Sequence, residues 1–169
     1  YRGNERQEAN AAREQRVKCR AEEYQSLRLA FDETIHANVA IEAAQSKANL
    51  DLIDNDNADG LYWTTWAYRF RQYRDLIDDE ILAIYREAPP EESPIFDDWL
   101  DVADKMTNFR AAVEELRYAA AVESESRWDS AWQPFYDSRD DAKSAPFTFA
   151  TNLRQVSVNT CEARIPIRE

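Results

Sequence analysis

Glycine is nearly absent from this chain, and residues 4–59 contain neither glycine nor proline. Within that stretch, residues 5–52 are rich in Ala, Glu, Gln and Arg, which are strong helix formers. A helix of this length would extend over about 70 Å, whereas a compact globule of 169 residues is only about 40 Å across. We therefore expect residues 1–28 to form a charged helical arm or stalk that continues into a bundle. The scarcity of glycine also disfavours β-sandwiches and nucleotide-binding glycine loops.

Apolar side chains recur at spacings of three and four residues along three segments, as they do on one face of an amphipathic helix. On the first segment they are Val17, Ala21, Tyr24, Leu27, Phe31, Ile35 and Val39. On the second, residues 61–87, they are Trp63, Trp66, Phe70, Tyr73, Ile77, Ile81 and Ile84. On the third, which ends near residue 123 or continues towards 132, they are Phe96, Trp99, Ala103, Met106, Phe109, Val113, Leu116 and Ala120. Turn-forming residues at 54–60 and prolines at 89–94 separate the segments, so neighbouring helices must lie side by side. The sequence predicts an all-α fold, an antiparallel three- to four-helix bundle over residues 5–133.

Residues 134–169 differ from the rest of the chain. Pro134, Pro146 and Pro166 interrupt them, and proline disfavours the interior of a helix because it lacks an amide hydrogen. Residues 155–159 alternate between polar and apolar side chains, as in a short strand. We expect an irregular, extended C-terminal tail packed on the bundle, with a two-stranded pairing as the alternative.

The chain has two cysteines, Cys19 and Cys161, and both lie in polar stretches where a small buried hydrophobic residue is not expected. This context favours a disulfide that ties the tail to the first helix. In the chain-entropy model, such a bridge contributes about 4–5 kcal/mol. A disulfide indicates an extracytoplasmic, envelope-associated or virion-associated protein, and two free thiols, the alternative, would indicate the cytoplasm.

The net charge of −12 is unevenly distributed. Residues 1–28 hold seven Lys or Arg and five Asp or Glu, so an acidic body follows a mildly basic arm. An acidic body argues against binding to a nucleic-acid backbone. No run of 18 apolar residues is present, so the sequence predicts no membrane span in this chain. The start at Tyr1 is compatible with a signal or membrane anchor removed upstream of it.

His36 is the one histidine of the chain, and with Glu33 it has the Glu-x-x-His spacing that di-iron bundles use twice. A second histidine is absent, and the chain lacks four good nitrogen or sulfur ligands for structural zinc. It also lacks a Gly-x-Ser-x-Gly motif, and residues 54–60 depart from the calcium-loop pattern. Adjacent carboxylates such as Asp78 and Asp79 are typical of solvated helix faces. We predict no catalytic, cofactor-binding or metal-binding residue, and we expect His36 to be a polar flank of its helix.

Aromatic residues exceed what one apolar stripe needs. Tyr62 and Tyr68 fall off the stripe of the second helix, and Trp128, Trp132 and Tyr136 belong to a second group near the end of the third. Surplus aromatics indicate either burial on two faces or an interface with a partner. These five residues are our candidates for an interaction surface, with core packing and a small-ligand or cation pocket as the alternatives.

Taken together, these features favour a non-enzymatic helical structural or interaction protein that binds a protein partner or a second copy of itself. The arm and the expected disulfide favour the soluble part of an envelope-associated, membrane-tethered or virion-type assembly component. The alternative is an acidic inhibitor or immunity-type protein that binds a basic partner through charge complementarity. An enzyme that uses His36 and nearby carboxylates is a third class.

Overall fold

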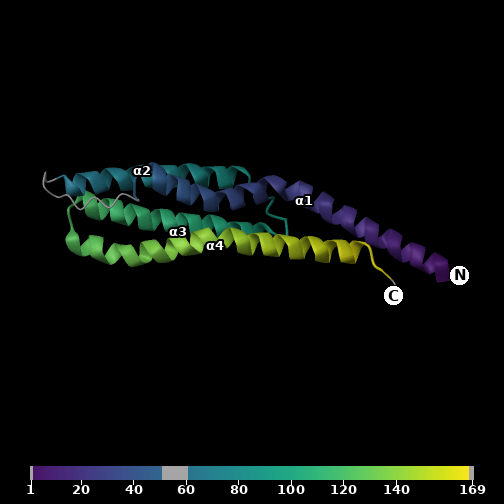
Figure 1. Cartoon of the computed structure of the whole chain (residues 1–169). Helices are drawn as coiled ribbons and strands as arrows, with labels where there is room; N and C mark the ends of the chain where they lie inside the picture. Colours follow the sequence, from purple (N-terminus) through teal and green to yellow (C-terminus); the bar gives the residue numbers. More distant parts are fainter. Residues whose placement is uncertain (1, 51–60, 168–169) are drawn as a thin grey trace.

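The structure, a computed structural model, describes residues 2–50 and 61–167 of the chain. These residues form four helices and no strand: α1 (Arg2–Lys47), α2 (Tyr62–Arg86), α3 (Phe96–Ala121) and α4 (Glu125–Arg164). The helices alternate in direction along one long axis, and each packs against two neighbours in a ring (Figure 1). The predicted all-α antiparallel bundle with a long N-terminal helix is confirmed.

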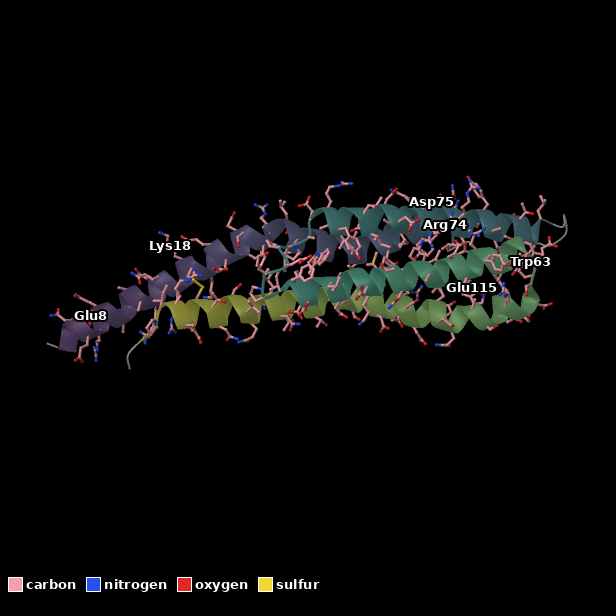
Figure 2. The ribbon with its side chains drawn as sticks, turned by 180° about the vertical axis from the view of Figure 1, so that it is seen from behind. Glu8, Lys18, Trp63, Arg74, Asp75 and Glu115 are labelled. Carbon is pink, nitrogen blue, oxygen red and sulfur yellow. A yellow bond between two sulfur atoms is a disulfide. The ribbon has the colours of Figure 1, made fainter. Side chains whose placement is uncertain are left out.

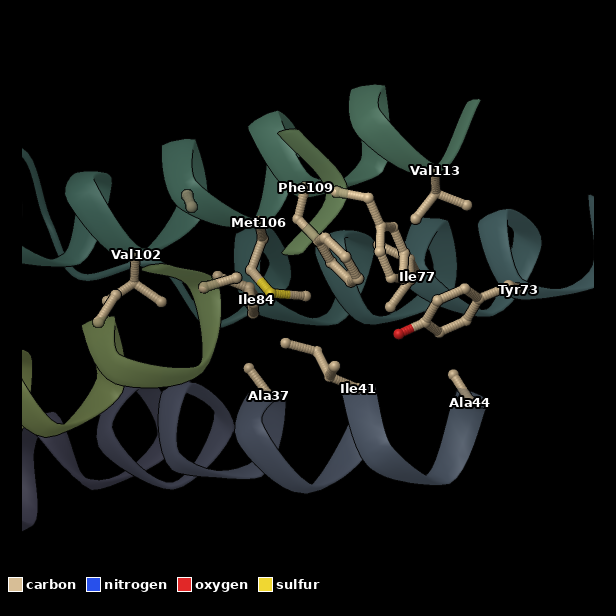
Figure 3. Close-up of a cluster of buried hydrophobic side chains, with 14 of the residues drawn as sticks. Ala37, Ile41, Ala44, Tyr73, Ile77, Ile84, Val102, Met106, Phe109 and Val113 are labelled. Atoms are coloured by element: carbon tan, nitrogen blue, oxygen red, sulfur yellow. The ribbon is translucent and has the colours of Figure 1, made fainter. Parts of the chain in front are cut away.

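The centre of the bundle is built mainly by α2 and α3. Ile77, Met106 and Phe109 converge between the helices, and Ile41 of α1 closes the core from the other side (Figure 3). The predicted apolar stripes of α2 and α3 provide this core, and their central residues are fully buried. Burying each large apolar side chain contributes about 1.5–3 kcal/mol, so these two helices carry most of the hydrophobic stabilisation.

The apolar face predicted for α1 is wrong over much of its length. Val17 and Val39 belong to the predicted stripe, yet each is 60% exposed. The residues that α1 buries are mostly small: Cys19, Ala30, Thr34, Ala37, Ile41 and Ala44. Small side chains let α1 approach its neighbours closely. The prediction failed because it followed the large side chains and gave little weight to alanine.

The predicted irregular tail is also wrong, because α4 continues through Pro134 and Pro146 to Arg164. Residues 155–159 are helical and form no strand. Small and apolar residues of α4 are buried at helical spacing: Trp128, Ala131, Phe135, Ala142, Ala145, Phe149, Leu153, Ser157 and Cys161. A proline inside a helix costs about 3 kcal/mol relative to alanine, and burial of this long face outweighs that cost.

The third predicted segment ends before residue 132 because the chain turns between α3 and α4. Glu123 has a φ of 55°, in the left-handed region that commonly terminates a helix. The Ser124 amide donates to the Ala119 carbonyl at 2.9 Å, which closes the end of α3. The Ser124 hydroxyl accepts a hydrogen bond from the Arg127 amide at 3.3 Å and caps the start of α4. The antiparallel crossing from α3 to α4 is thus encoded locally.

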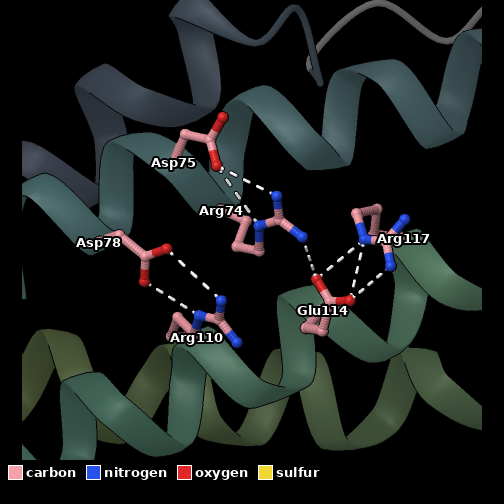
Figure 4. Close-up of polar contacts among 6 residues, drawn as sticks. All are labelled: Arg74, Asp75, Asp78, Arg110, Glu114 and Arg117. Carbon is pink, nitrogen blue, oxygen red and sulfur yellow. Dashed lines mark hydrogen bonds and ion pairs between the residues drawn. The ribbon is translucent and has the colours of Figure 1, made fainter.

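Ion pairs join α2 to α3 on the outer surface of the bundle (Figure 4). Arg74 Nη1 donates to Glu114 Oε2 at 2.7 Å, and Arg117 Nη2 donates to Glu114 Oε1 at 2.6 Å. Farther along, Arg110 Nε donates to Asp78 Oδ1 at 2.9 Å. These charge-assisted hydrogen bonds favour one register of α2 against α3.

A disulfide, drawn in yellow in Figure 2, connects α1 to the C-terminal end of α4. The predicted pairing of Cys19 with Cys161 is confirmed: their sulfurs lie at bonding distance and their Cα atoms are 5.8 Å apart. Beside it, Arg16 Nε donates to the Ile165 carbonyl at 2.6 Å. In the arm predicted at residues 1–28, α4 therefore packs against α1 from about Arg16 onwards. Residues 3–15 are mostly exposed and extend beyond the end of α4 (Figure 1).

Two expectations concern other parts of the chain. The turn predicted at 54–60 lies outside the described residues. Among the helices that the structure describes, none has a stretch long and apolar enough to cross a lipid bilayer.

Candidate functional site

The end of the bundle opposite the disulfide contains an open cavity of about 460 Å³. The C-terminal end of α1, the start of α2 and the first half of α4 meet there. Trp63, near the start of α2, marks this end in Figure 2, and Glu8 of α1 marks the other. Aromatic side chains of α2 and α4 form most of the wall: Tyr62, Trp66, Trp128, Trp132, Phe135 and Tyr136. We call this cavity the aromatic pocket.

Trp128 is the centre of the aromatic packing around the pocket. It is only 7% exposed, and its ring contacts Trp63 and Phe70 of α2 edge-on at centroid distances of 5.6 and 5.7 Å. The Trp132 ring lies 5.2 Å away at nearly a right angle. Edge-to-face geometry is favourable for aromatic pairs, so these contacts fix the floor of the pocket. Trp128 therefore belongs to the core as well as to the pocket wall.

The outer part of the wall is accessible. Trp66 and Trp132 are half-buried, and Tyr136, stacked on Trp132 at 5.7 Å, is 43% exposed. A pocket of this size, walled by aromatic side chains and with polar groups among them, offers the kinds of contact that ligands and peptide side chains make.

Arg139 provides the cationic group of the pocket. Its guanidinium lies 5.2 Å from the Tyr136 ring and 5.7 Å from the Phe135 ring, in cation–π geometry. Arg139 Nη1 makes a long hydrogen bond of 3.4 Å to Gln45 Oε1. Its Nε is buried, and within the described residues it has no hydrogen-bond acceptor. An unsatisfied buried donor is costly, so a hydrogen-bond acceptor that reached Arg139 Nε would remove that cost.

The structure places the five predicted interaction residues unequally. Tyr62, Trp128, Trp132 and Tyr136 come together at the aromatic pocket, although they derive from two distant parts of the sequence. Tyr68 lies outside it, is 56% exposed, and accepts a hydrogen bond from Gln72 at 2.9 Å. Trp66 and Arg139 were not among the predicted site residues. The i, i+4, i+7 relation of Trp132, Tyr136 and Arg139 on one helix face is the signal that identifies Arg139.

A separate polar cluster joins α1 to α2 at mid-length. His36 Nδ1 lies 3.2 Å from Glu80 Oε2 and 3.7 Å from Glu33 Oε1. The His36 side chain is 60% exposed, in agreement with a polar flank, whereas Glu80 is buried. Sequence analysis missed Glu80 because it is 44 residues from His36 and occurs among other acidic residues of its helix.

Comparison with known proteins adds no relative. No family model matches the chain, and neither the curated proteins nor the solved structures include a significant match. The function is therefore inferred from the residues of this chain.

Proposed function

We propose that this chain is a non-enzymatic structural or interaction protein, a helical rod that binds a segment of a partner protein in its aromatic pocket. The observation that carries the proposal is the open, aromatic-walled cavity lined by Arg139, whose buried Nε has no acceptor among the described residues. Tryptophan, tyrosine and arginine are the residues that most often dominate binding energy at protein interfaces. All three meet at this pocket.

The pocket defines the chemistry of the partner segment. An apolar or aromatic side chain of the partner would fill the space beside Trp66 and Trp132. A carbonyl or carboxylate oxygen next to that side chain would accept the hydrogen bond that Arg139 Nε does not make within residues 2–50 and 61–167. Hydrogen bonds from charged donors contribute about 1.5–3 kcal/mol, so this contact would provide specificity as well as affinity.

The disulfide supports a role outside the reducing cytosol. We propose that the chain is the soluble part of an envelope-associated, membrane-tethered or virion-type assembly component. In this arrangement, the end of the rod near the chain termini would connect to the rest of the assembly. The aromatic end would then be presented to the partner.

Selection from a displayed library of random peptides tests the binding site. The oxidised protein is the target, and the support without protein serves for depletion of unspecific binders. We expect enriched peptides to share an apolar anchor followed or preceded by Asp, Glu or a free C-terminus. Synthetic versions should bind Arg139→Gln at least about tenfold more weakly than the parent protein, because the charged donor is lost.

Tyr68→Ala is the matched control, since it removes an exposed aromatic residue outside the pocket. It should leave the affinity of the selected peptides unchanged. Enriched peptides that bind the parent and Arg139→Gln proteins equally, or a library without enrichment, would refute the proposed site. Selection of Lys-rich and Arg-rich peptides whose affinity collapses with added salt would instead favour an acidic inhibitor of a basic protein.

A further inference from the structure

The polar cluster of Glu33, His36 and Glu80 has the composition of a metal site. Each residue offers one ligand atom, and these three atoms lie within 4.8 Å of one another. Glu33 and His36 are one turn apart on α1, and Glu80 faces them from α2. The cluster lies roughly 27 Å along α2 from Tyr62, so it is distinct from the aromatic pocket.

Glu80 is an unusual carboxylate within this fold. Its side chain is only 8% exposed, and its neighbours on the same face of α2 are Ile77, Ile81 and Ile84. Glu114 and Asp78, which are less buried, pair with arginines. Among the described residues, Glu80 forms no ion pair with a lysine or an arginine. Its partners are His36 and a second carboxylate, Glu33. Within the part of the chain that the structure describes, no lysine or arginine therefore compensates the charge that Glu80 carries when it is ionised.

We propose that Glu33, His36 and Glu80 bind a divalent transition-metal ion, with Zn²⁺ as the reference ion. Ligand atoms around tetrahedral Zn²⁺, at bond lengths of about 2.0–2.2 Å, are separated by about 3.3–3.6 Å. The separations of His36 Nδ1 from Glu80 Oε2 and from Glu33 Oε1, 3.2 and 3.7 Å, bracket that value. The imidazole favours zinc and similar ions over Mg²⁺ and Ca²⁺, which prefer all-oxygen sites.

The environment of the cluster also fits a bound ion. His36 is exposed, so an ion can enter from solvent and water can complete its coordination. Both cysteines are bonded to one another, so no thiol of the chain competes for the metal. An ion shared by α1 and α2 would compensate the charge of Glu80 and join the two helices.

Isothermal titration calorimetry of tag-free, chelator-treated protein with ZnCl₂ tests this site. We expect one Zn²⁺ per chain with micromolar affinity. Glu80→Gln and His36→Gln should each weaken binding by more than about tenfold, because each removes a ligand. Titration with CoCl₂ should produce visible absorption of a low-symmetry site in the parent protein and not in the variants.

Glu22→Gln is the matched control, since Glu22 is an exposed carboxylate of α1 whose charge pairs with Lys18. It changes the net charge equally and should retain full affinity for Zn²⁺. Circular dichroism verifies that each variant is as helical as the parent. Absence of stoichiometric binding would overturn the proposal, as would several weak sites unaffected by Glu80→Gln and His36→Gln.

Discussion

Glu80 and Glu114 show how the same side chain acquires opposite properties in one fold. Burial raises the pKa of Glu80 to about 7, and the nearby Glu33 carboxylate adds to the increase. The hydrogen bond from Arg117, supported by that from Arg74, lowers the pKa of Glu114 to about 2 despite partial burial. Glu114 is thus a stable anion between two cations, whereas Glu80 favours its protonated form unless a positive charge is supplied.

The raised pKa of Glu80 predicts a pH-dependent stability of the metal-free protein. Between about pH 4.5 and pH 7 the unfolded chain releases this proton while the folded chain retains it. Stability from this group therefore falls as pH rises through that window and remains low above it. The free energy of unfolding of Glu80→Gln, taken relative to that of the parent, should therefore increase by about 1–3 kcal/mol from pH 4 to pH 8.

Urea unfolding in EDTA, followed by tryptophan fluorescence at both pH values, measures this difference. Glu33 and His36, which face Glu80 from α1, are retained in the comparison so that one group alone changes. Glu22→Gln should show the same offset from the parent at pH 4 and pH 8. An equal effect of Glu80→Gln at the two pH values would contradict the assignment.

Sequence alone located part of the candidate site. Tyr62, Trp128, Trp132 and Tyr136 were predictable because surplus aromatics stand out against an amphipathic pattern. Their convergence was not, because it depends on α4 folding back along α3 and α1, which brings its aromatic side chains across the core to those of α2. Arg139 and Glu80 resemble ordinary surface charges in the sequence, and only the packing of neighbouring helices distinguishes them.

At the level of elements, the large side chains of α2 and α3 made their buried faces readable. Half of the buried face of α1 is alanine, the best helix former, and composition cannot distinguish a buried alanine from one that faces solvent. In α4 the prolines led to a wrong prediction, although the sequence contains a helical pattern of buried residues four apart. These residues are Ala145, Phe149, Leu153, Ser157 and Cys161. Local propensity misled where tertiary burial was decisive.

Pro134 provides a test of this balance within α4. It is exposed inside the helix and cannot donate to the Ser130 carbonyl, so Pro134→Ala restores a hydrogen bond without loss of packing. We expect the free energy of unfolding to rise by about 1–3 kcal/mol in urea titrations. Pro146→Ala should be less favourable because the Pro146 ring is buried. A Pro134→Ala protein less stable than the parent would contradict a continuous α4.

The whole molecule is organised by its two ends. The disulfide fastens α1 to α4 near the termini, and the aromatic pocket lies at the opposite end. Between them, a core of large residues from α2 and α3 and small residues from α1 keeps the rod narrow (Figures 1 and 3). The disulfide and the aromatic pocket thus lie at opposite ends of the rod.

The disulfide should stabilise the whole fold because its two cysteines are 142 residues apart. In the chain-entropy model, opening it lowers the free energy of unfolding by about 4–5 kcal/mol. Urea titrations with and without a reductant measure this loss. The Cys19→Ser/Cys161→Ser protein should show no response to the reductant. A loss of less than about 1 kcal/mol in the reduced parent would contradict the stabilising role of the disulfide.

The central claim is that the chain is an extended rod with its disulfide and its aromatic pocket at opposite ends. Small-angle X-ray scattering of the oxidised monomer, separated by size exclusion, tests it directly. A rod about 70 Å long and two helices wide predicts a radius of gyration of about 21 Å. A value near 15 Å, that of a compact globule of this size, would contradict the account.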